Sequence, residues 1–268
     1  MTTLVTGARG KLARVVIERL LETGETVRAA SRDPQNTDLP SDVEPVLVDF
    51  TKPETLAPAL QGVDKVFLYA AHEGIDDFLA EAKRAGVRRL VLLSSAAAGM
   101  PNAETHQIGR MHVAAEKPIE ESGIPYTFVR PAQFATNSLW WAESIRGEGV
   151  VRVPYPEARV NPIHERDIAD VAFLALTADG HEGHKYMIDG PGGMTQREQV
   201  GVIAEAIGRD ITVEELPREV AEKYLPSALL DMLAAGGIDS YGPTSEAVTG
   251  KPARTYRQWA ADHAADFS

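Results

Sequence analysis

The chain has 268 residues, of which 44% are hydrophobic and 25% charged, and its formal net charge is −12. The composition is ordinary for a globular protein that can bury a full core, and the acidic balance disfavours nonspecific binding to nucleic acid or an anionic membrane. The absence of cysteine excludes disulfides, thiolate metal sites and thiol nucleophiles. No apolar stretch reaches the ~18 residues of a membrane helix. The N-terminus shows no signal-peptide pattern, so we expect a cytoplasmic protein.

The first half of the chain alternates short β-branched runs with helical stretches, a pattern typical of βαβ units around a parallel sheet. The pattern predicts strands at residues 3–6, 26–31, 46–49, 65–69, 89–94 and 126–129. It predicts helices at 11–22, 51–60, 76–85 and 111–121, with Pro118 expected to kink or divide the last one. The fold class expected is therefore α/β, with a Rossmann-type doubly wound parallel sheet.

Beyond Pro131 the strict alternation ends. The sequence predicts two further helices, at residues 165–177 and 196–207, and a strand at 185–188 between them. We predict a core over residues 1–131 and a smaller C-terminal lobe over residues 132–268, partly interleaved with the core sheet.

The first predicted strand runs into a GxxGxxA turn that opens a helix, Gly7-Ala8-Arg9-Gly10-Lys11-Leu12-Ala13. In such a turn the first glycine permits a tight bend and the second lets the backbone approach a pyrophosphate. The small third residue lets helix and strand pack closely. The first N–H groups of the helix then point at the phosphates. Residues 1–131 are therefore predicted to bind a dinucleotide. The C-terminal lobe is predicted to bind the substrate of the protein.

The residues after the second predicted strand bear on which dinucleotide binds. NAD-selective sites place an acid about 20 residues beyond the glycine turn, where it binds the ribose 2′-hydroxyl. Counting from Gly10 leads instead to Arg32, and Arg9 lies within the turn. Both guanidinium groups suit a 2′-phosphate, although Asp33 beside Arg32 weakens the argument. We favour NADP, with NAD as the alternative.

With these residues in place, the chain resembles the atypical short-chain dehydrogenase/reductases, specifically the NmrA-like branch with quinone and azo-compound reductases. The resemblance covers about residues 3–210 and rests on segments such as LVTGARGKLARVV, VRAASRDP, SGIPYTFVRPAQF and NPIHERDIADVAFLAL. It implies positions for seven cofactor-binding and active-site residues. Asp49 and Phe50 would border the adenine, Ala70, Ala71 and His72 would lie under the nicotinamide ribose, and Ser94 and Ser95 would lie near the nicotinamide ring.

The chain departs from the superfamily in its proton donor. Typical members carry a tyrosine followed four residues later by a lysine that lowers the tyrosine's pKa for proton transfer. None of the seven tyrosines here has lysine at that offset. Alignment on Glu116 puts His112 in the lysine's place and Ile108 in the tyrosine's, and the NmrA-like branch commonly lacks the tyrosine. Ser95 and His112 are the predicted catalytic donors; alternatively, His112 is a helix residue bonded to a backbone carbonyl.

Aromatic side chains are concentrated between residues 134 and 141. Ligands of doubly wound folds bind beyond the carboxyl ends of the strands, and flat rings stack on planar substrates. Phe134, Asn137 and Trp140 are the predicted substrate contacts; alternatively, Trp140 and Trp141 pack a lobe interface or a partner subunit. Further predictions of the sequence are that Met100 and Tyr155 line the same pocket, that His164 and Asp167 orient the start of a helix, and that no metal is bound.

These features together predict an NAD(P)H-dependent oxidoreductase that transfers a hydride to a small planar conjugated acceptor, such as a quinone or an aromatic polyketide. Two alternatives remain open. One is a non-catalytic NAD(P)-binding redox sensor or regulator. The other is an auxiliary oxygen-using, monooxygenase-type enzyme of aromatic natural-product metabolism. The sequence leaves the oligomeric state and the direction of reaction open.

Overall fold

A computed structural model of the chain describes residues 1–36, 39–69, 73–105 and 107–268. The chain divides into two compact units. The first unit comprises Met1–Arg130 and Ile168–Met187, and the second comprises Pro131–Asp167 and Ile188–Ser268. Among the described residues, no helix is long and apolar enough to cross a membrane.

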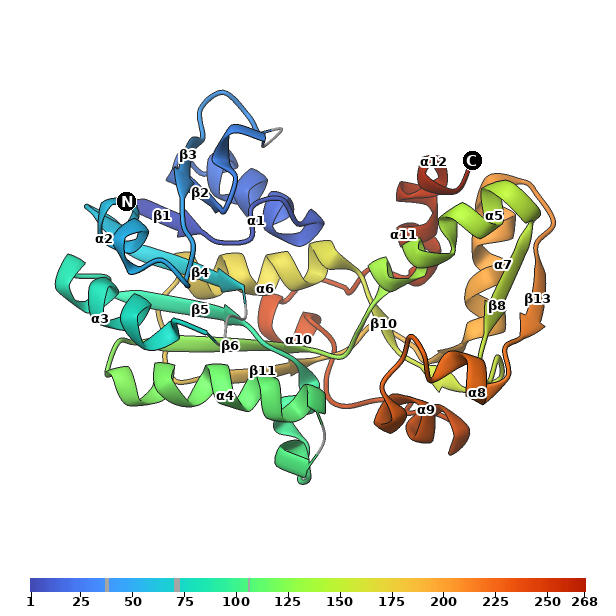
Figure 1. Ribbon diagram of the computed structural model, residues 1–268. Helices are drawn as coiled ribbons and strands as arrows, with labels where there is room; N and C mark the ends of the chain where they lie inside the picture. Colours follow the sequence, from blue (N-terminus) through green and yellow to red (C-terminus); the bar gives the residue numbers. More distant parts are fainter. Residues whose placement is uncertain (37–38, 70–72, 106) are drawn as a thin grey trace. The chain divides into compact units, whose positions relative to one another are not determined.

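The first unit is built on a seven-stranded sheet of order β3-β2-β1-β4-β5-β6-β11 (Figure 1). β1 pairs in parallel with β2 and β4, and parallel pairing continues outward to β3 and to β6. This is the strand order of a Rossmann fold, so the predicted fold class is confirmed. The strands are β1 (Thr2–Val5), β2 (Thr26–Ser31), β3 (Glu44–Leu47), β4 (Lys65–Tyr69), β5 (Arg89–Leu93), β6 (Tyr126–Pro131) and β11 (Lys185–Ile188).

Helices cover both faces of this sheet. A continuous apolar core joins the helices α2, α3 and α4 to one face, with Phe78 and Phe128 fully buried in it. Helices α1 and α6 lie side by side elsewhere on the unit, where Nε of Arg19 donates to Oδ1 of Asp170 over 2.8 Å. The helices and short 3-10 turns are α1 (Lys11–Glu22), η1 (Pro34–Asn36), η2 (Pro53–Thr55), α2 (Leu56–Leu60), α3 (Ile75–Ala85), η3 (Ala96–Gly99), η4 (Ala103–Thr105), α4 (Gln107–Ser122) and α6 (Glu165–Thr177).

The α4 helix differs from the expectation that Pro118 would divide it. It starts at Gln107 and runs without interruption to Ser122. A proline inside a helix removes one hydrogen bond and crowds the carbonyl four residues before it, but the neighbouring Ala115 and Ile119 are fully buried in the core. The packing of α4 on the sheet therefore offsets the local cost, and Ile108, His112 and Glu116 lie on one continuous helix.

The second unit has three two-stranded sheets and its own core. Trp259 is fully buried in that core and stacks on Tyr256 and His263, with ring centroids 5.1 and 4.7 Å apart. The strands are β7 (Gln133–Phe134), β8 (Val150–Val153), β9 (Arg159–Val160), β10 (Pro162–Ile163), β12 (Met194–Thr195) and β13 (Thr212–Glu215). The helices are η5 (Ala135–Trp141), α5 (Ala142–Glu148), α7 (Gln196–Ile207), α8 (Arg218–Ala221), α9 (Ser227–Ala234), α10 (Glu246–Thr249), α11 (Tyr256–Asp262) and α12 (Ala264–Phe267).

Candidate functional site

A cavity of about 470 Å³ opens at the carboxyl ends of four neighbouring strands of the first unit. This is the edge at which open α/β sheets bind their ligands. Three short segments and one aromatic residue form its wall. They lie at or just after the ends of β1, β2, β3 and β4. They are Thr6–Arg9, Ala30–Arg32, Val48–Thr51 and Tyr69.

The glycine turn has the geometry that its sequence predicts. Gly7 has φ = +66°, in the left-handed region that favours glycine. The N–H of Gly10 donates to the carbonyl oxygen of Gly7 over 2.8 Å. Gly10 immediately precedes α1 and offers no capping side chain, and the first turn of α1 holds no acid. The end of α1 therefore carries unopposed positive dipole, and Arg9 adds a cation on the cavity wall. These residues fit a dinucleotide whose diphosphate lies against the turn.

The part of the cavity wall that follows β2 and β3 carries charges of both signs. Arg32 is exposed on the wall, beyond a turn in which the hydroxyl of Ser31 accepts from the N–H of Asp33 over 3.1 Å. Asp49 accepts from the hydroxyl and the N–H of Thr51 over 2.7 and 3.1 Å. These hydrogen bonds hold the pKa of Asp49 below its usual range. A ligand in this part of the cavity therefore meets a guanidinium group and a fixed carboxylate.

A buried ionic network lies at the end of β5. The hydroxyl of Ser94 donates to Oε1 of Glu116 over 2.6 Å, and Nε of Arg130 donates to the same oxygen over 2.8 Å. Nη2 of Arg130 donates to the second carboxylate oxygen, which completes a bidentate pair. Ser94, Glu116 and Arg130 are all at least nine-tenths buried. Since the hydroxyl hydrogen of Ser94 is committed to Glu116, Ser94 has only acceptor capacity toward any other group.

The hydroxyl of the neighbouring Ser95 accepts a hydrogen bond, whereas that of Ser94 donates one. The hydroxyl oxygen of Ser95 accepts from the N–H of Ala97 over 3.2 Å and so caps the short turn η3. Its own hydrogen is not used in that contact, and the side chain is half-buried. His112 is also half-buried and lies one helical turn before Glu116 on α4. Ser95 therefore has the donor capacity that the sequence assigns to it.

Other predicted site residues lie elsewhere. Ala70, Ala71 and His72 fall outside the described residues. Lys11 and Leu12 start α1, and with Gly10 they adjoin the cavity wall rather than line it.

In the second unit, Phe134 and Asn137 are half-buried, at and just after β7. Trp140 is 74% exposed, whereas Trp141 packs against the core of the unit. The two adjacent tryptophans thus have different environments. Tyr155 has φ = +51°, and no other non-glycine residue in the described part of the chain has a positive φ.

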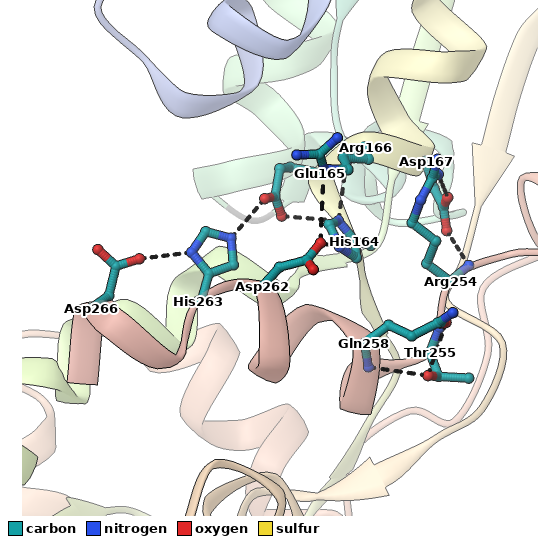
Figure 2. A network of polar contacts seen from close by, with 10 residues as sticks. All are labelled: His164, Glu165, Arg166, Asp167, Arg254, Thr255, Gln258, Asp262, His263 and Asp266. Atoms are coloured by element: carbon teal, nitrogen blue, oxygen red, sulfur yellow. Dashed lines mark hydrogen bonds and ion pairs between the residues drawn. The ribbon is translucent and has the colours of Figure 1, made fainter. Parts of the chain in front are cut away.

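The role expected for His164 and Asp167 at the start of a helix is confirmed (Figure 2). Nδ1 of His164 accepts from the N–H of Arg166 over 3.2 Å, and Asp167 accepts from the N–H of Arg254 over 2.7 Å and from its guanidinium group. These contacts join the start of α6 to the segment before α11. They explain the conspicuous HERD sequence without a catalytic role. Among the described residues, no three His, Cys, Asp or Glu side chains are arranged to hold a metal ion.

The sequence prediction missed half of the cavity wall. Thr6, Ala30, Ser31, Val48, Thr51 and Tyr69 line it but were not predicted as site residues. All lie at or just beyond the carboxyl end of a strand. That position was a usable signal for all six, including Tyr69, which was expected to end its strand.

Comparison with known proteins agrees with this geometry. A family model described as NAD(P)H-binding matches residues 7–179. The chain is 40% identical to a (4-alkanoyl-5-oxo-2,5-dihydrofuran-3-yl)methyl phosphate reductase of Streptomyces griseus, with 99% of each chain covered. It is 33% identical to an NAD(P)H azoreductase of Xenophilus azovorans, with 98% of each covered. It also resembles the structure of an NADPH-dependent quinone oxidoreductase from Escherichia coli complexed with NADPH, with 25% identity, a TM-score of 0.77, and 97% and 99% of the two chains covered.

The glycine turn, the strand order and the similarity to these reductases over nearly their full length lead to one assignment. The chain belongs to the NAD(P)H-binding family of atypical short-chain dehydrogenase/reductases, in the NmrA-like branch of NAD(P)H-dependent reductases.

Proposed function

We propose that this chain is an NADPH-dependent reductase of strongly conjugated carbonyl acceptors, in which the hydride-accepting atom is conjugated to at least one carbonyl group. The observation that carries the proposal is the replacement of the usual tyrosine and lysine. On the alignment through Glu116, Ile108 and His112 take those positions in α4, and the hydroxyl of Ser94 already donates to Glu116. The chain therefore lacks the strong phenolic acid that reduction of an isolated ketone requires.

Conjugation removes the need for that acid. When bound, the dihydronicotinamide of the cofactor supplies a hydride. In an isolated ketone the resulting charge stays on one alkoxide oxygen, whereas in a conjugated acceptor it spreads over an enolate or a hydroquinone anion. A weak donor such as the hydroxyl of Ser95 then suffices to stabilise the oxygen. The proton that completes the reduction comes from solvent, through Ser95 or His112.

The substrates of the relatives support this class. The name of the Streptomyces griseus reductase describes a ring double bond, one end of which carries both a lactone carbonyl and an alkanoyl group. A hydride added to the other end leaves a negative charge shared by two carbonyl oxygens. Quinones, including quinonoid aromatic polyketides, delocalise the charge in the same way. We infer that the acceptor is a quinone or an acylated butenolide.

The preference for NADPH rests on Arg9 and Arg32. Both lie on the cavity wall. Two guanidinium groups suit a 2′-phosphate, and the solved relative from Escherichia coli holds NADPH. The ionised carboxylate of Asp49 lies in the same cavity and repels a phosphate. That repulsion is weaker if the carboxylate faces the base of the dinucleotide than if it faces the ribose.

Turnover with four acceptors tests the proposal: a quinone, an acylbutenolide phosphate, an azo compound and an isolated ketone. Each is assayed at saturating NADPH after binding of the cofactor has been verified by fluorescence. We expect reduction of the quinone or the butenolide and none of the ketone. Equal rates with the ketone would refute the acceptor class. Tight cofactor binding with no turnover of any acceptor would instead favour the redox-sensor alternative.

A further inference from the structure

Tyr69 is an exposed aromatic residue at the end of a buried strand. The other four residues of β4 are buried, whereas Tyr69 is 45% exposed. Its backbone is fixed, because its N–H donates to the hydroxyl of Thr6 over 2.7 Å and its partner in β5 is Leu93. The ring is thus held at a defined place, and its exposure is not the result of a loose backbone.

The side chain packs on the glycine turn. A Cβ atom placed on Gly7 would lie 3.2 Å from Cβ, 3.3 Å from Cγ and 3.4 Å from Cδ2 of Tyr69. The tyrosine therefore covers the space that a side chain at position 7 would fill. From there the residue lines the cavity, whose wall also includes Arg9, Arg32 and Asp49.

The cavity corresponds to the adenosine half of a dinucleotide. Its wall consists of the glycine turn and the ends of β2 and β3, and neither Ser95 nor His112 is part of it. In this fold the diphosphate lies on the glycine turn, and the residues that follow the second strand bind the adenosine ribose. The base is the one flat apolar surface in that half of the ligand, and Tyr69 and Phe50 are the only aromatic residues on the described wall.

We propose that Tyr69 is a cofactor-binding residue whose ring packs on the adenine of the bound dinucleotide. An aromatic ring gains most by stacking on a base, which presents a π-face whatever its substituents. The ring is fixed in advance by Thr6 and Gly7, so little side-chain freedom is lost on binding. This assignment depends only on dinucleotide binding and not on the acceptor class proposed above.

Binding of ADP, which contains the adenosine half alone, tests the assignment by calorimetry without any turnover. Tyr69→Ala is expected to weaken ADP and NADPH binding by the same factor, roughly fivefold or more. Tyr69→Phe keeps the ring and is expected to bind both ligands as the wild type does. Tyr224→Ala is the matched control, because Tyr224 is 76% exposed in the second unit.

Two results would overturn the assignment. Unchanged ADP affinity in Tyr69→Ala shows that the ring does not contact the base, and an equal loss in Tyr69→Phe shows that the hydroxyl rather than the ring carries the contact. Thermal unfolding of each variant checks that the glycine turn is intact. If Tyr69→Ala is unstable, Tyr69→Leu fills the space on Gly7 without a flat ring and is expected to show the same loss of ADP affinity. If the acceptor proposal fails instead, the expected turnover of the conjugated acceptors is not observed, while the affinities for ADP and NADPH are unaffected.

Discussion

The hydroxyl of Ser94 donates a hydrogen bond to Oε1 of Glu116 over 2.6 Å, and Nε of Arg130 donates to the same oxygen over 2.8 Å. The end of β5 is thereby joined to the middle of α4 and to the end of β6. Alignment on Glu116 puts Ile108 and His112 where the resemblance predicts a tyrosine and a lysine. The ionic network lies one helical turn beyond His112 on α4 and fixes two strand ends of the first unit.

Removal of one partner of the Glu116–Arg130 pair should be far more damaging than removal of both. Glu116→Ala leaves a buried guanidinium unpaired, and we expect the free energy of unfolding to fall by about 3–5 kcal/mol. The double variant Glu116→Leu with Arg130→Met should recover most of that loss, since it buries no charge. Urea unfolding measures both.

The matched control for this experiment is Glu205→Ala, which breaks an ion pair with Arg257 whose side chains are both more than 60% exposed. It should cost at most about 1 kcal/mol. A double variant no more stable than Glu116→Ala would show that the network stabilises the fold through packing alone.

Ser95 is expected to matter for turnover rather than for cofactor binding. Ser95→Ala removes the donor proposed for the acceptor oxygen. We expect kcat with a quinone to fall about tenfold, below the ~10²–10⁴-fold typical of general acid catalysis because the charge is delocalised. Ser95→Thr keeps the hydroxyl and should restore most of the rate. Ser41→Ala, at an exposed serine, is the control, and an unchanged kcat in Ser95→Ala would eliminate this serine as the donor.

Local pattern was sufficient to predict much of this fold. Helices α1, α6 and α7 and strands β2, β4 and β11 have the predicted bounds. Buried residues recur at helical spacing in α1 and α7, and β4 is a short run of buried residues. β3 was placed two residues too late, at 46–49 rather than Glu44–Leu47. It is the edge strand, and none of its residues is buried, so no apolar face marks its register. The continuity of α4 through Pro118 depends on packing that only the folded chain supplies.

The site was predictable where one segment carries its chemistry. The glycine turn and Arg32 follow from spacing along the chain, and both line the cavity. Tyr69 was expected to end its strand, but the packing of its side chain on Gly7, 62 residues away in the sequence, could not be read from local pattern. The pairing of Glu116 with Arg130 was missed for a similar reason, since it joins a helix to the next strand through side chains alone.

Arg32 should set the cofactor preference. Arg32→Ala is expected to weaken NADPH binding by about tenfold, as expected for loss of one charge-assisted hydrogen bond, and to leave NADH binding unchanged because NADH has no 2′-phosphate. The ratio of the two dissociation constants, measured by fluorescence titration, is the readout. Arg84→Ala, at a 70% exposed side chain on α3 outside the cavity wall, should leave the ratio unchanged. Equal losses for both cofactors would show that Arg32 does not recognise the 2′-phosphate.

The C-terminal helices should respond to pH through His263 (Figure 2). Its Nε2 lies 2.8 Å from Oε1 of Glu165, and its Nδ1 lies 2.7 Å from Oδ2 of Asp266. Both contacts are hydrogen bonds only when both ring nitrogens carry a hydrogen, so the folded chain favours the imidazolium. Burial raises the pKa of Glu165, but the hydrogen bond from His263 and the electrostatic attraction of His164 outweigh it and hold this pKa far below its usual range.

These two groups define a pH window for stability. The lowered pKa of Glu165 gives a contribution that is present above its unfolded pKa of about 4.3 and is lost as the pH falls through the folded value. The imidazolium contribution is fully present below the unfolded pKa of about 6.5 and is lost as the pH rises. We therefore expect the free energy of unfolding to fall by about 1.5–3 kcal/mol from about pH 6 to about pH 9, the value of a charge-assisted hydrogen bond.

His263→Gln should remove most of that fall, because an amide keeps its donors and acceptors over the whole range. Urea unfolding of the two proteins at both pH values gives the difference, and His184→Gln serves as the control at an exposed histidine of the first unit. The control should behave as the wild type. If His263→Gln shows the full wild-type pH dependence, that dependence does not come from protonation of His263. The neutral imidazole is then the form that docks α12, and one of its two carboxylate contacts is repulsive.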